Sequence, residues 1–317
     1  SYTTFKTNYA DYGAALCREV GATGGSGHDN VFIANHAYTG GAALAWLGAS
    51  NITITRYNFT DNTAGVRGGA IYIDTGSDNC KVLECIFEGN HITNITERHD
   101  GGAIVCNANN LEVADSSFTD NSAYNGGAIY VTNNVNSGST QILRSNFTDN
   151  HAVEYGGAIG LKASSVTVNQ SNFKDNTATN GSALYVGGED TNYIYESNFE
   201  DNKAEGKGGA IDWESSIGHI FDFNFTLNTA DYGGALYLGG TSDNTIVHNV
   251  IFYSNTAREN GGAIDCNASK MNLTDTSFDS NRAKYGAGLC REGYSTGGFG
   301  ENNNFTNNHA SIGGAAL

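Results

Sequence analysis

The sequence predicts an all-β protein: a right-handed single-stranded parallel β-helix of about 11–12 coils, with about 27 residues and three short strands in each coil. The first observation is Phe-x-x-Asn, which occurs twelve times between Phe5 and Phe305 at steps of 26 to 31 residues. The second is Gly-Gly-Ala-Ile/Leu, which alternates with it. The third is that short alternating runs, such as 52–55, are bounded by Gly, Asn, Asp and Ser, and no window has the 3.6-residue period of a helix.

The fixed residues of the repeat have physical reasons if the coils stack. A buried column of Phe supplies most of the apolar area, since one ring can bury roughly 150–250 Å². A buried amide is costly unless it is paired, so the Asn of each copy predicts a ladder of stacked side chains that donate to one another and to turn carbonyls. The Gly-Gly pair allows positive φ at the next corner. The predicted ladder comprises Asn8, Asn35, Asn62, Asn90, Asn121, Asn150, Asn176, Asn202, Asn228, Asn255, Asn281 and Asn308.

The repeat continues through residues 1–317 without a linker, which predicts a single β-helix domain on the order of 55 Å long at about 4.8 Å per coil. Residues 5–44 align with 278–317 at a constant offset of 273, and 24 of the 40 positions are identical. We therefore expect a higher-order repeat of ten coils. Neither end carries a cap, so we expect either pairing with another copy or a segment cut from a longer chain. Both imply an extended fibre.

Composition limits the partners and the location of the protein. The formal charge of −17 and the pI near 4.6 argue against nucleic acids and anionic membranes. No apolar run is long enough to cross a bilayer, so no membrane insertion is expected. Glycosylation would place the chain outside the cell, although sequons also arise by chance in an Asn- and Thr-rich sequence. The candidate glycosylation sites are Asn51, Asn58, Asn94, Asn146, Asn169, Asn180, Asn224, Asn267, Asn272 and Asn304.

The six cysteines show no zinc spacing and no CxxC pair. Cys106 and Cys266 occupy a repeat position that is apolar in other coils, which predicts small core residues. The residues expected to face outward are Cys17 and Cys290. Cys80 and Cys85 bracket one strand, where a disulfide would close a small loop, and the sequence leaves the pairing open.

The residue before the ladder Asn is an aspartate in four consecutive coils, at Asp120, Asp149, Asp175 and Asp201. Carboxylates stacked about 4.8 Å apart repel unless a cation or turn N–H groups offset them, so calcium along this edge is one possibility. Asp is also an ordinary turn former, which is the alternative. No other cofactor is expected.

An aromatic column is predicted on the outside, because Tyr72, Tyr130, Tyr185 and Tyr237 follow the Ile or Leu of the Gly-Gly-Ala motif and should face outward by alternation. It could stack against sugar rings or a neighbouring rod, or simply reflect β-propensity. The same position is Asp212 in one coil, which interrupts the column.

Candidate catalytic groups are few. They are Asp212 and Glu214 flanking Trp213, Asp265, and the longer connection from His91 to Asp100, which contains Glu97, Arg98 and His99. Glycan cleavage needs carboxylates or a base that converge on one groove, and these residues form no evident cluster. We therefore expect no enzyme and no catalytic residue.

The two repeated elements together resemble the polymorphic outer membrane protein repeats of chlamydial surface proteins and of archaeal adhesin-like proteins. The resemblance includes 68–71, 126–129, 156–159, 208–211, 233–236 and 261–264, and all twelve Phe-x-x-Asn elements. It implies a right-handed β-helix at the cell surface with adhesive or structural roles, and it supplies no catalytic residues. The predicted function is an extracellular structural or adhesive rod, a module of a long fibre or filament. Its partners would be other copies, end to end or laterally, and surface glycans; the alternative is a polysaccharide lyase or hydrolase.

Overall fold

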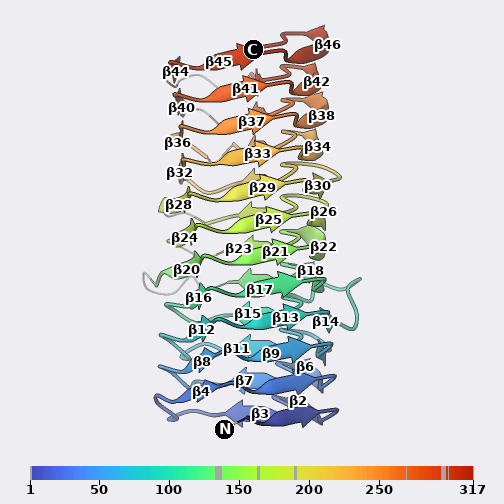
Figure 1. The fold of residues 1–317 in the computed structure, drawn as a ribbon, viewed down its shortest axis with the longest axis vertical. Coiled ribbons are helices and arrows are strands. Elements are labelled where there is room, and N and C mark those ends of the chain that lie inside the picture. Colours follow the sequence, from blue (N-terminus) through green and yellow to red (C-terminus); the bar gives the residue numbers. More distant parts are fainter. Residues whose placement is uncertain are drawn as a thin grey trace.

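The protein is a single column of stacked coils (Figure 1). The structure is a computed structural model that describes residues 2–132, 138–162, 165–188, 191–240, 242–268, 270–293, 298 and 300–316. These residues contain 46 strands and no helix, so the described chain has no helix that could cross a membrane. Each strand pairs in parallel with its counterpart in the next coil, for example Phe147 with Phe173. The predicted parallel β-helix is confirmed.

Each coil contributes four short strands, one to each of four sheets, where the sequence predicted three strands. The extra strand arises within the Phe-x-x-Asn-x-Ala element. The residue before the ladder Asn has positive φ, as in Asp149 with φ 55°, and this single residue bends the chain. The Phe and the Ala that follow it therefore lie in two different sheets.

Sheets 1 and 2 contain these two strands of each coil. The strands of sheet 1 are β1 (Thr4–Lys6), β5 (Val31–Ile33), β9 (Asn58–Thr60), β13 (Ile86–Glu88), β17 (Ser117–Thr119), β21 (Asn146–Thr148), β25 (Asn172–Lys174), β29 (Asn198–Glu200), β33 (Asn224–Thr226), β37 (Ile251–Tyr253), β41 (Ser277–Asp279) and β45 (Asn304–Thr306). The strands of sheet 2 are β2 (Tyr9–Tyr12), β6 (His36–Gly40), β10 (Thr63–Ala64), β14 (His91–Ile92), β18 (Ser122–Asn125), β22 (His151–Tyr155), β26 (Thr177–Ala178), β30 (Lys203–Ala204), β34 (Thr229–Tyr232), β38 (Thr256–Asn260), β42 (Arg282–Tyr285) and β46 (His309–Gly313).

Sheet 3 follows the Gly-Gly corner, and sheet 4 returns the chain to sheet 1. The strands of sheet 3 are β3 (Leu16–Arg18), β7 (Leu44–Trp46), β11 (Ile71–Ile73), β15 (Ile104–Cys106), β19 (Ile129–Val131), β23 (Ile159–Leu161), β27 (Leu184–Val186), β31 (Ile211–Trp213), β35 (Leu236–Leu238), β39 (Ile264–Cys266) and β43 (Leu289–Arg291). The strands of sheet 4 are β4 (Ser26–His28), β8 (Thr53–Thr55), β12 (Lys81–Leu83), β16 (Glu112–Ala114), β20 (Thr140–Leu143), β24 (Val166–Asn169), β28 (Thr191–Tyr195), β32 (Ile217–Phe221), β36 (Thr245–His248), β40 (Met271–Thr274) and β44 (Gly300–Glu301).

The twelve Phe side chains form one internal stack. The centroids of neighbouring rings lie 4.5–5.1 Å apart. The ten rings from Phe32 to Phe278 are essentially inaccessible to solvent, and Phe5 and Phe305 pack against the two ends of the same core. This continuous apolar column is what holds coil against coil.

The ladder asparagines satisfy their amides completely in the interior coils. Asn150 Nδ2 donates to Asn176 Oδ1 at 3.0 Å and to the backbone oxygen of Phe118 at 3.0 Å. The Asn150 backbone N–H donates to the same Asn176 Oδ1 at 3.1 Å. The side-chain bond joins every adjacent pair from Asn8 to Asn308 at 2.7–3.1 Å.

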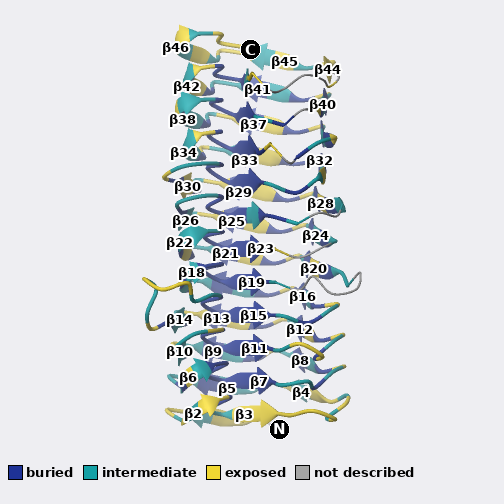
Figure 2. Cartoon of the chain, turned by 180° about the vertical axis from the view of Figure 1, so that it is seen from behind, coloured by how far each residue is buried: buried dark blue, intermediate teal, exposed yellow. Residues whose placement is uncertain are grey.

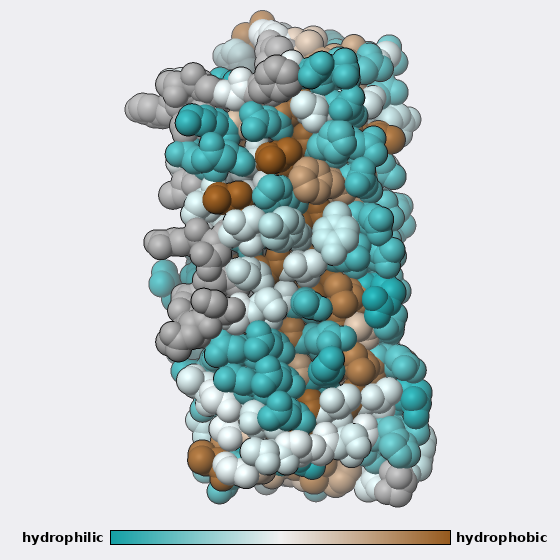
Figure 3. All heavy atoms as spheres, turned by 90° about the vertical axis from the view of Figure 1, so that its left-hand side faces the viewer, coloured by the Kyte–Doolittle hydropathy of each residue, from teal (hydrophilic) through white to brown (hydrophobic). Residues whose placement is uncertain are grey.

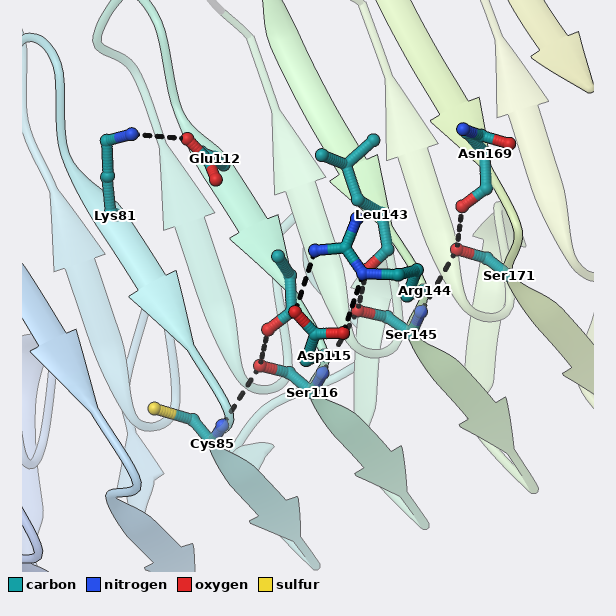
Figure 4. A network of polar contacts seen from close by, with 11 residues as sticks. Lys81, Cys85, Glu112, Asp115, Ser116, Leu143, Arg144, Ser145, Asn169 and Ser171 are labelled. Atoms are coloured by element: carbon teal, nitrogen blue, oxygen red, sulfur yellow. Dashed lines mark hydrogen bonds and ion pairs between the residues drawn. The ribbon is translucent and has the colours of Figure 1, made fainter.

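A second polar ladder lies at the corner between sheets 4 and 1 (Figure 4). The backbone N–H of Cys85 donates to Ser116 Oγ at 3.0 Å, and the N–H of Ser116 donates to Ser145 Oγ at 3.2 Å. The N–H of Ser145 in turn donates to Ser171 Oγ at 3.2 Å. Each hydroxyl also donates to a carbonyl two residues earlier, such as Leu143 O for Ser145 at 2.9 Å. Sequence reasoning identified the Asn ladder and missed this one.

The outer face of sheet 4 is largely hydrophilic, with hydrophobic side chains between the polar ones (Figure 3). Ion pairs link adjacent coils there, as between Lys81 and Glu112 at 2.6 Å and between Arg144 and Asp115 at 2.7 Å (Figure 4). Pairs this exposed contribute little to stability, about 0–1 kcal/mol each.

The expectation of a 273-residue repeat concerns segments 5–44 and 278–317. Of the second segment, residues 294–297, 299 and 317 lie outside the described residues. In the described part, Phe5 and Phe278 lie in sheet 1, and Cys17 and Cys290 lie in sheet 3. The ten-coil repeat stays a prediction.

Candidate functional site

The outward side chains of sheet 3 lie at the bottom of a groove. Tyr72, Tyr130 and Tyr237 are only 2–5% exposed, so the predicted exposed aromatic column is wrong at these positions, and Tyr185 is half-buried. Figure 2 shows the consequence, because β7, β11, β15, β19 and β23 are buried across their full width while β3 is exposed. The reason is that side chains before the Gly-Gly corner and after the strand cover the strand from both sides.

Tyr72 illustrates a coil in which this groove is filled. Its hydroxyl accepts from Arg67 Nη1 at 3.2 Å and from Asn107 Nδ2 at 3.2 Å, and it donates to Asp74 Oδ1 at 2.7 Å. Burial, with the bond to Asp74, raises the pKa of Tyr72 to about 12. Every polar position of this side chain is used, and no room for a ligand remains.

The groove opens further along, where a side chain is missing from the column. Gly160 occupies the outward position of β23, and a Cβ there would meet the ring of Tyr130. Tyr155, from the same coil as Gly160, lies beside Tyr185 of the next coil, with ring centroids 4.5 Å apart and planes inclined by 46°. A pocket of about 350 Å³ lies over this part of sheet 3. Its side-chain lining is Tyr155, Asn180, Tyr185, Lys207, Asp212 and Glu214.

Asp212 is the buried acid of this pocket. It is the central residue of β31, and its neighbours in the sheet are Tyr185 and Tyr237. The residue is 2% exposed, and no protein group in the described part of the chain forms a hydrogen bond with its Oδ1. Burial raises the pKa of Asp212 well above its usual range, Glu214 adds to this, and Lys207 opposes it. Burial therefore disfavours the charged carboxylate of Asp212 relative to its protonated form.

Lys207 supplies the positive charge of the pocket. Its Nζ lies 4.3 Å from the centroid of the Tyr237 ring and 3.7 Å from Glu214 Oε1. The backbone N–H of Lys207 donates to Asn180 Oδ1 at 3.1 Å, which fixes the corner before Gly208. Gly208 has φ 61° and therefore needs the freedom of glycine. Burial lowers the pKa of Lys207, but Tyr237, Asp212 and Glu214 together raise it above its usual value.

Asp265 is a second buried carboxyl in the same column, outside the pocket. It lies between Tyr237 and Cys290 in sheet 3 and is fully buried. Neither carboxyl oxygen of Asp265 has a well-formed hydrogen bond with the described residues, although the backbone of Cys266 lies close to this carboxyl. Burial, and then the nearby Glu292, raise the pKa of Asp265 to about 7.

The candidate catalytic residues do not converge as a whole. Asp212 and Glu214 share one pocket, whereas Asp265 is two strands away, about 9.6 Å at the usual strand spacing. Tyr237 lies between Asp212 and Asp265, and its ring is covered by Lys207. Trp213 points into the core and is fully buried.

The longer connection from His91 to Asp100 projects from the stack after β14 (Figure 1). His99 Nε2 lies 3.4 Å from Glu97 Oε2, and Asn125 donates to Asp100 Oδ1 at 2.8 Å. Burial raises the pKa of Asp100. None of these residues lines the Asp212 pocket.

The aspartates considered for calcium all occupy one left-handed corner. Asp120, Asp149, Asp175 and Asp201 have φ of 53–55°, and the same position has positive φ in all twelve coils. Asp tolerates this conformation better than most residues, which favours the interpretation of the row as turn-forming residues. Across the described ranges, no group of three or more His, Cys, Asp or Glu could hold a metal ion.

The remaining predicted residues have the following positions. Among the candidate glycosylation sites, Asn51, Asn146, Asn224 and Asn304 are exposed and the other six are partly buried. All six cysteines are free thiols. Cys80, Cys85, Cys106 and Cys266 are buried, Cys17 is exposed and Cys290 is half-buried.

Sequence reasoning missed Tyr155, Asn180 and Lys207 as pocket residues. Each is the residue directly before a Gly-Gly or Gly-Ser corner. The sequence could have identified this position as part of the groove, because a residue before a tight corner lies beside the strand that follows the corner.

The repeat resemblance is confirmed by comparison with known proteins. Four segments, residues 57–74, 115–132, 196–212 and 249–267, match the Chlamydia polymorphic membrane protein repeat. Each segment includes one strand each of sheets 1, 2 and 3, so the match follows the Phe, Asn and Gly-Gly-Ala positions. A further 150-residue stretch, 41% of the chain, is 33% identical to a probable autotransporter, YfaL, of Escherichia coli strain K12, and it covers 12% of that protein.

The fold and these matches together define the class of the protein. It is a parallel β-helix that carries the Chlamydia polymorphic membrane protein repeat in four places.

Proposed function

We propose that this chain is a structural and adhesive module of an extracellular or cell-surface rod, and that the rod is part of a long fibre or filament. The observation that supports this most is the uninterrupted stack from Phe5 to Phe305, in which every coil has the same core contacts. A solenoid built this way gains length without changing its cross-section. The surface-protein repeats within it favour the same role.

The proposed partners along the fibre are further copies of the same ten-coil unit, end to end or side by side. The constant offset of 273 residues supports this, since Tyr12 and Tyr285 are equivalent positions ten coils apart. Ten coils correspond to about 48 Å. Electron microscopy of the complete native protein should show thin fibres with a periodic feature near this spacing. Isolated compact particles that never join would contradict the filament proposal.

The adhesive role is proposed toward surface glycans. With a formal charge of −17, the protein repels polyanions, which favours uncharged ligands. Beads coated with the chain should bind to glycan-coated surfaces more than beads coated with albumin, and moderate salt should not release them. Equal retention of both kinds of bead would contradict the adhesive role.

We propose no catalytic role for the chain. Glycoside cleavage needs two carboxyls that reach one bond, and Tyr237 separates Asp212 from Asp265. Glu214 shares the pocket of Asp212, but its carboxylate is paired with Lys207 at 3.7 Å, which disfavours a role for it in cleavage. Turnover of a polysaccharide by the purified protein that Asp212→Asn abolishes would overturn this.

A further inference from the structure

We propose that the pocket over Asp212 binds one sugar unit of a neutral glycan, through the rings of Tyr155 and Tyr185 and the carboxyl of Asp212. This rests on the proposed adhesive function and assigns it a site. The ligand class is an uncharged hexose or N-acetylhexosamine unit at an accessible position of a longer chain.

The shape of the pocket suits a small ring. Its volume of about 350 Å³ lies at the low end of the range for small-molecule sites, roughly 300–1,000 Å³. Tyr155 and Tyr185 line one part of it with two inclined aromatic surfaces. Aromatic surfaces of this kind bury the C–H face of a sugar and leave its hydroxyls free to reach polar groups.

The polar groups of the pocket are arranged for hydroxyls. Asp212 Oδ1 is buried and has no protein partner in the described chain, and such a group costs about 1–3 kcal/mol until it is satisfied. A carboxyl accepts hydrogen bonds in either protonation state and donates one when protonated, so a sugar hydroxyl can pair with it in both cases. The carboxylate oxygens of Glu214 add hydrogen-bond acceptors at the edge of the pocket. They lie against Gly239, where the Cβ of any other residue would collide with this carboxylate.

The charges of the pocket favour an uncharged ligand. The Lys207 charge is already balanced by Glu214 at 3.7 Å and by the face of Tyr237. Burial raises the pKa of Asp212 well above its usual range, which disfavours its charged form. An anionic sugar would be repelled by Glu214 and by the negatively charged surface. A cation would be excluded, because Lys207 already occupies the position beside Glu214 and the Tyr237 ring.

The pocket is local to these coils. Further toward the N-terminus the same groove is closed, by Arg67 and Asp74 at Tyr72 and by the packed side chains of Tyr72, Val105 and Tyr130. Gly160, which lacks a side chain, ends that packed segment. The open pocket lies over the coils that follow, at Tyr185 and Asp212.

The test is binding of neutral oligosaccharides built from glucose, galactose, mannose or N-acetylglucosamine, first on an array and then by titration calorimetry at millimolar concentration. Tyr185→Ala and Asp212→Leu should each weaken binding by roughly tenfold or more, because they remove the ring surface and the hydrogen-bonding group. Asp212→Asn should retain binding within about threefold, since an amide also donates and accepts. Tyr193→Ala is the matched control, because Tyr193 is exposed on sheet 4 of the same coil and should leave binding unchanged.

Failure to fold does not obscure the result, because Asp212→Leu removes a buried carboxyl without a full set of partners and should not lower the unfolding midpoint. The proposal is overturned if no neutral glycan binds, if only acidic glycans or calcium bind, or if Tyr185→Ala and Asp212→Leu both bind as the parent does. If glycan-coated surfaces retain the Asp212→Leu protein fully, the rod remains adhesive and this site assignment alone fails.

Discussion

Asn150 donates its Nδ2–H to Oδ1 of Asn176 over 3.0 Å, and this bond passes from coil to coil through the whole stack. Asn150 also receives the backbone and side-chain N–H groups of Asn121, at 3.1 Å and 3.0 Å. The amide therefore satisfies groups in the coils on both sides of its own. This pairing with the coils on both sides explains why an Asn recurs in every copy of the repeat.

Asn150→Ala should lower the free energy of unfolding by roughly 3 kcal/mol, because buried donors of Asn121 lose their acceptor. Urea unfolding followed by circular dichroism measures this. Asn146→Ala, at an exposed position of β21 in the same coil, should change the midpoint little. Equal effects of the two substitutions would mean that the ladder contributes no stability of its own.

Phe147→Ala should cost about 4 kcal/mol, since the ring is fully buried between Phe118 and Phe173 at centroid distances of 4.8 Å and 4.9 Å. The same urea experiment applies. Ile86→Ala is the control, because Ile86 is 48% exposed on the outside of sheet 1 and should cost at most about 0.5 kcal/mol. A small loss for Phe147→Ala would contradict a close-packed Phe stack.

Asp149→Val should destabilise the protein by about 1–2 kcal/mol, and Asp149→Gly should be tolerated, because the backbone φ is 55°. The unfolding midpoint should be the same in EDTA and in millimolar calcium. A calcium-dependent rise of the midpoint that Asp149→Asn removes would instead show that the aspartate row binds the ion.

Asp265 should make stability fall as the pH rises. Its pKa is about 7 in the folded protein, raised by burial and Glu292, whereas an unfolded Asp titrates near 3.9. Between these values the folded state binds the proton and the unfolded state does not, so stability decreases from about pH 4 to pH 7. The other facing groups are Tyr237, Cys290 and Lys207.

Asp265→Asn removes this titration and should be more stable than the parent at pH 8, by up to about 4 kcal/mol, with little difference at pH 4. Urea midpoints at a series of pH values measure the difference. A difference that does not depend on pH would show that Asp265 is ionised in both states.

The sequence was sufficient for the coil, the Phe stack and the Asn ladder, because these depend on identical residues at a fixed period. It was not sufficient for the number of strands. The bend at Asp149 depends on backbone φ, and many residue types occupy that corner, including Ala34 and Leu227.

The sequence pattern also did not predict the groove over sheet 3. Alternation shows that Tyr72 faces away from the core, but it does not show that Arg67 and Asn107 cover it. These contacts join residues from separate corners and loops, which have no common motif. Asp212 was recognised as a candidate, while Lys207 and Asn180, which line the same pocket, were found only in the structure.

The central claim is that equivalent side chains of successive coils stack along one axis and build a rigid rod. Cryo-electron microscopy of the complete native protein tests it most directly. The predicted result is a straight rod with coil layers about 4.8 Å apart and an unbroken axial column of density for the Phe rings. Particles in which the layers are absent, or in which the Phe rings do not follow one another along an axis, would contradict it.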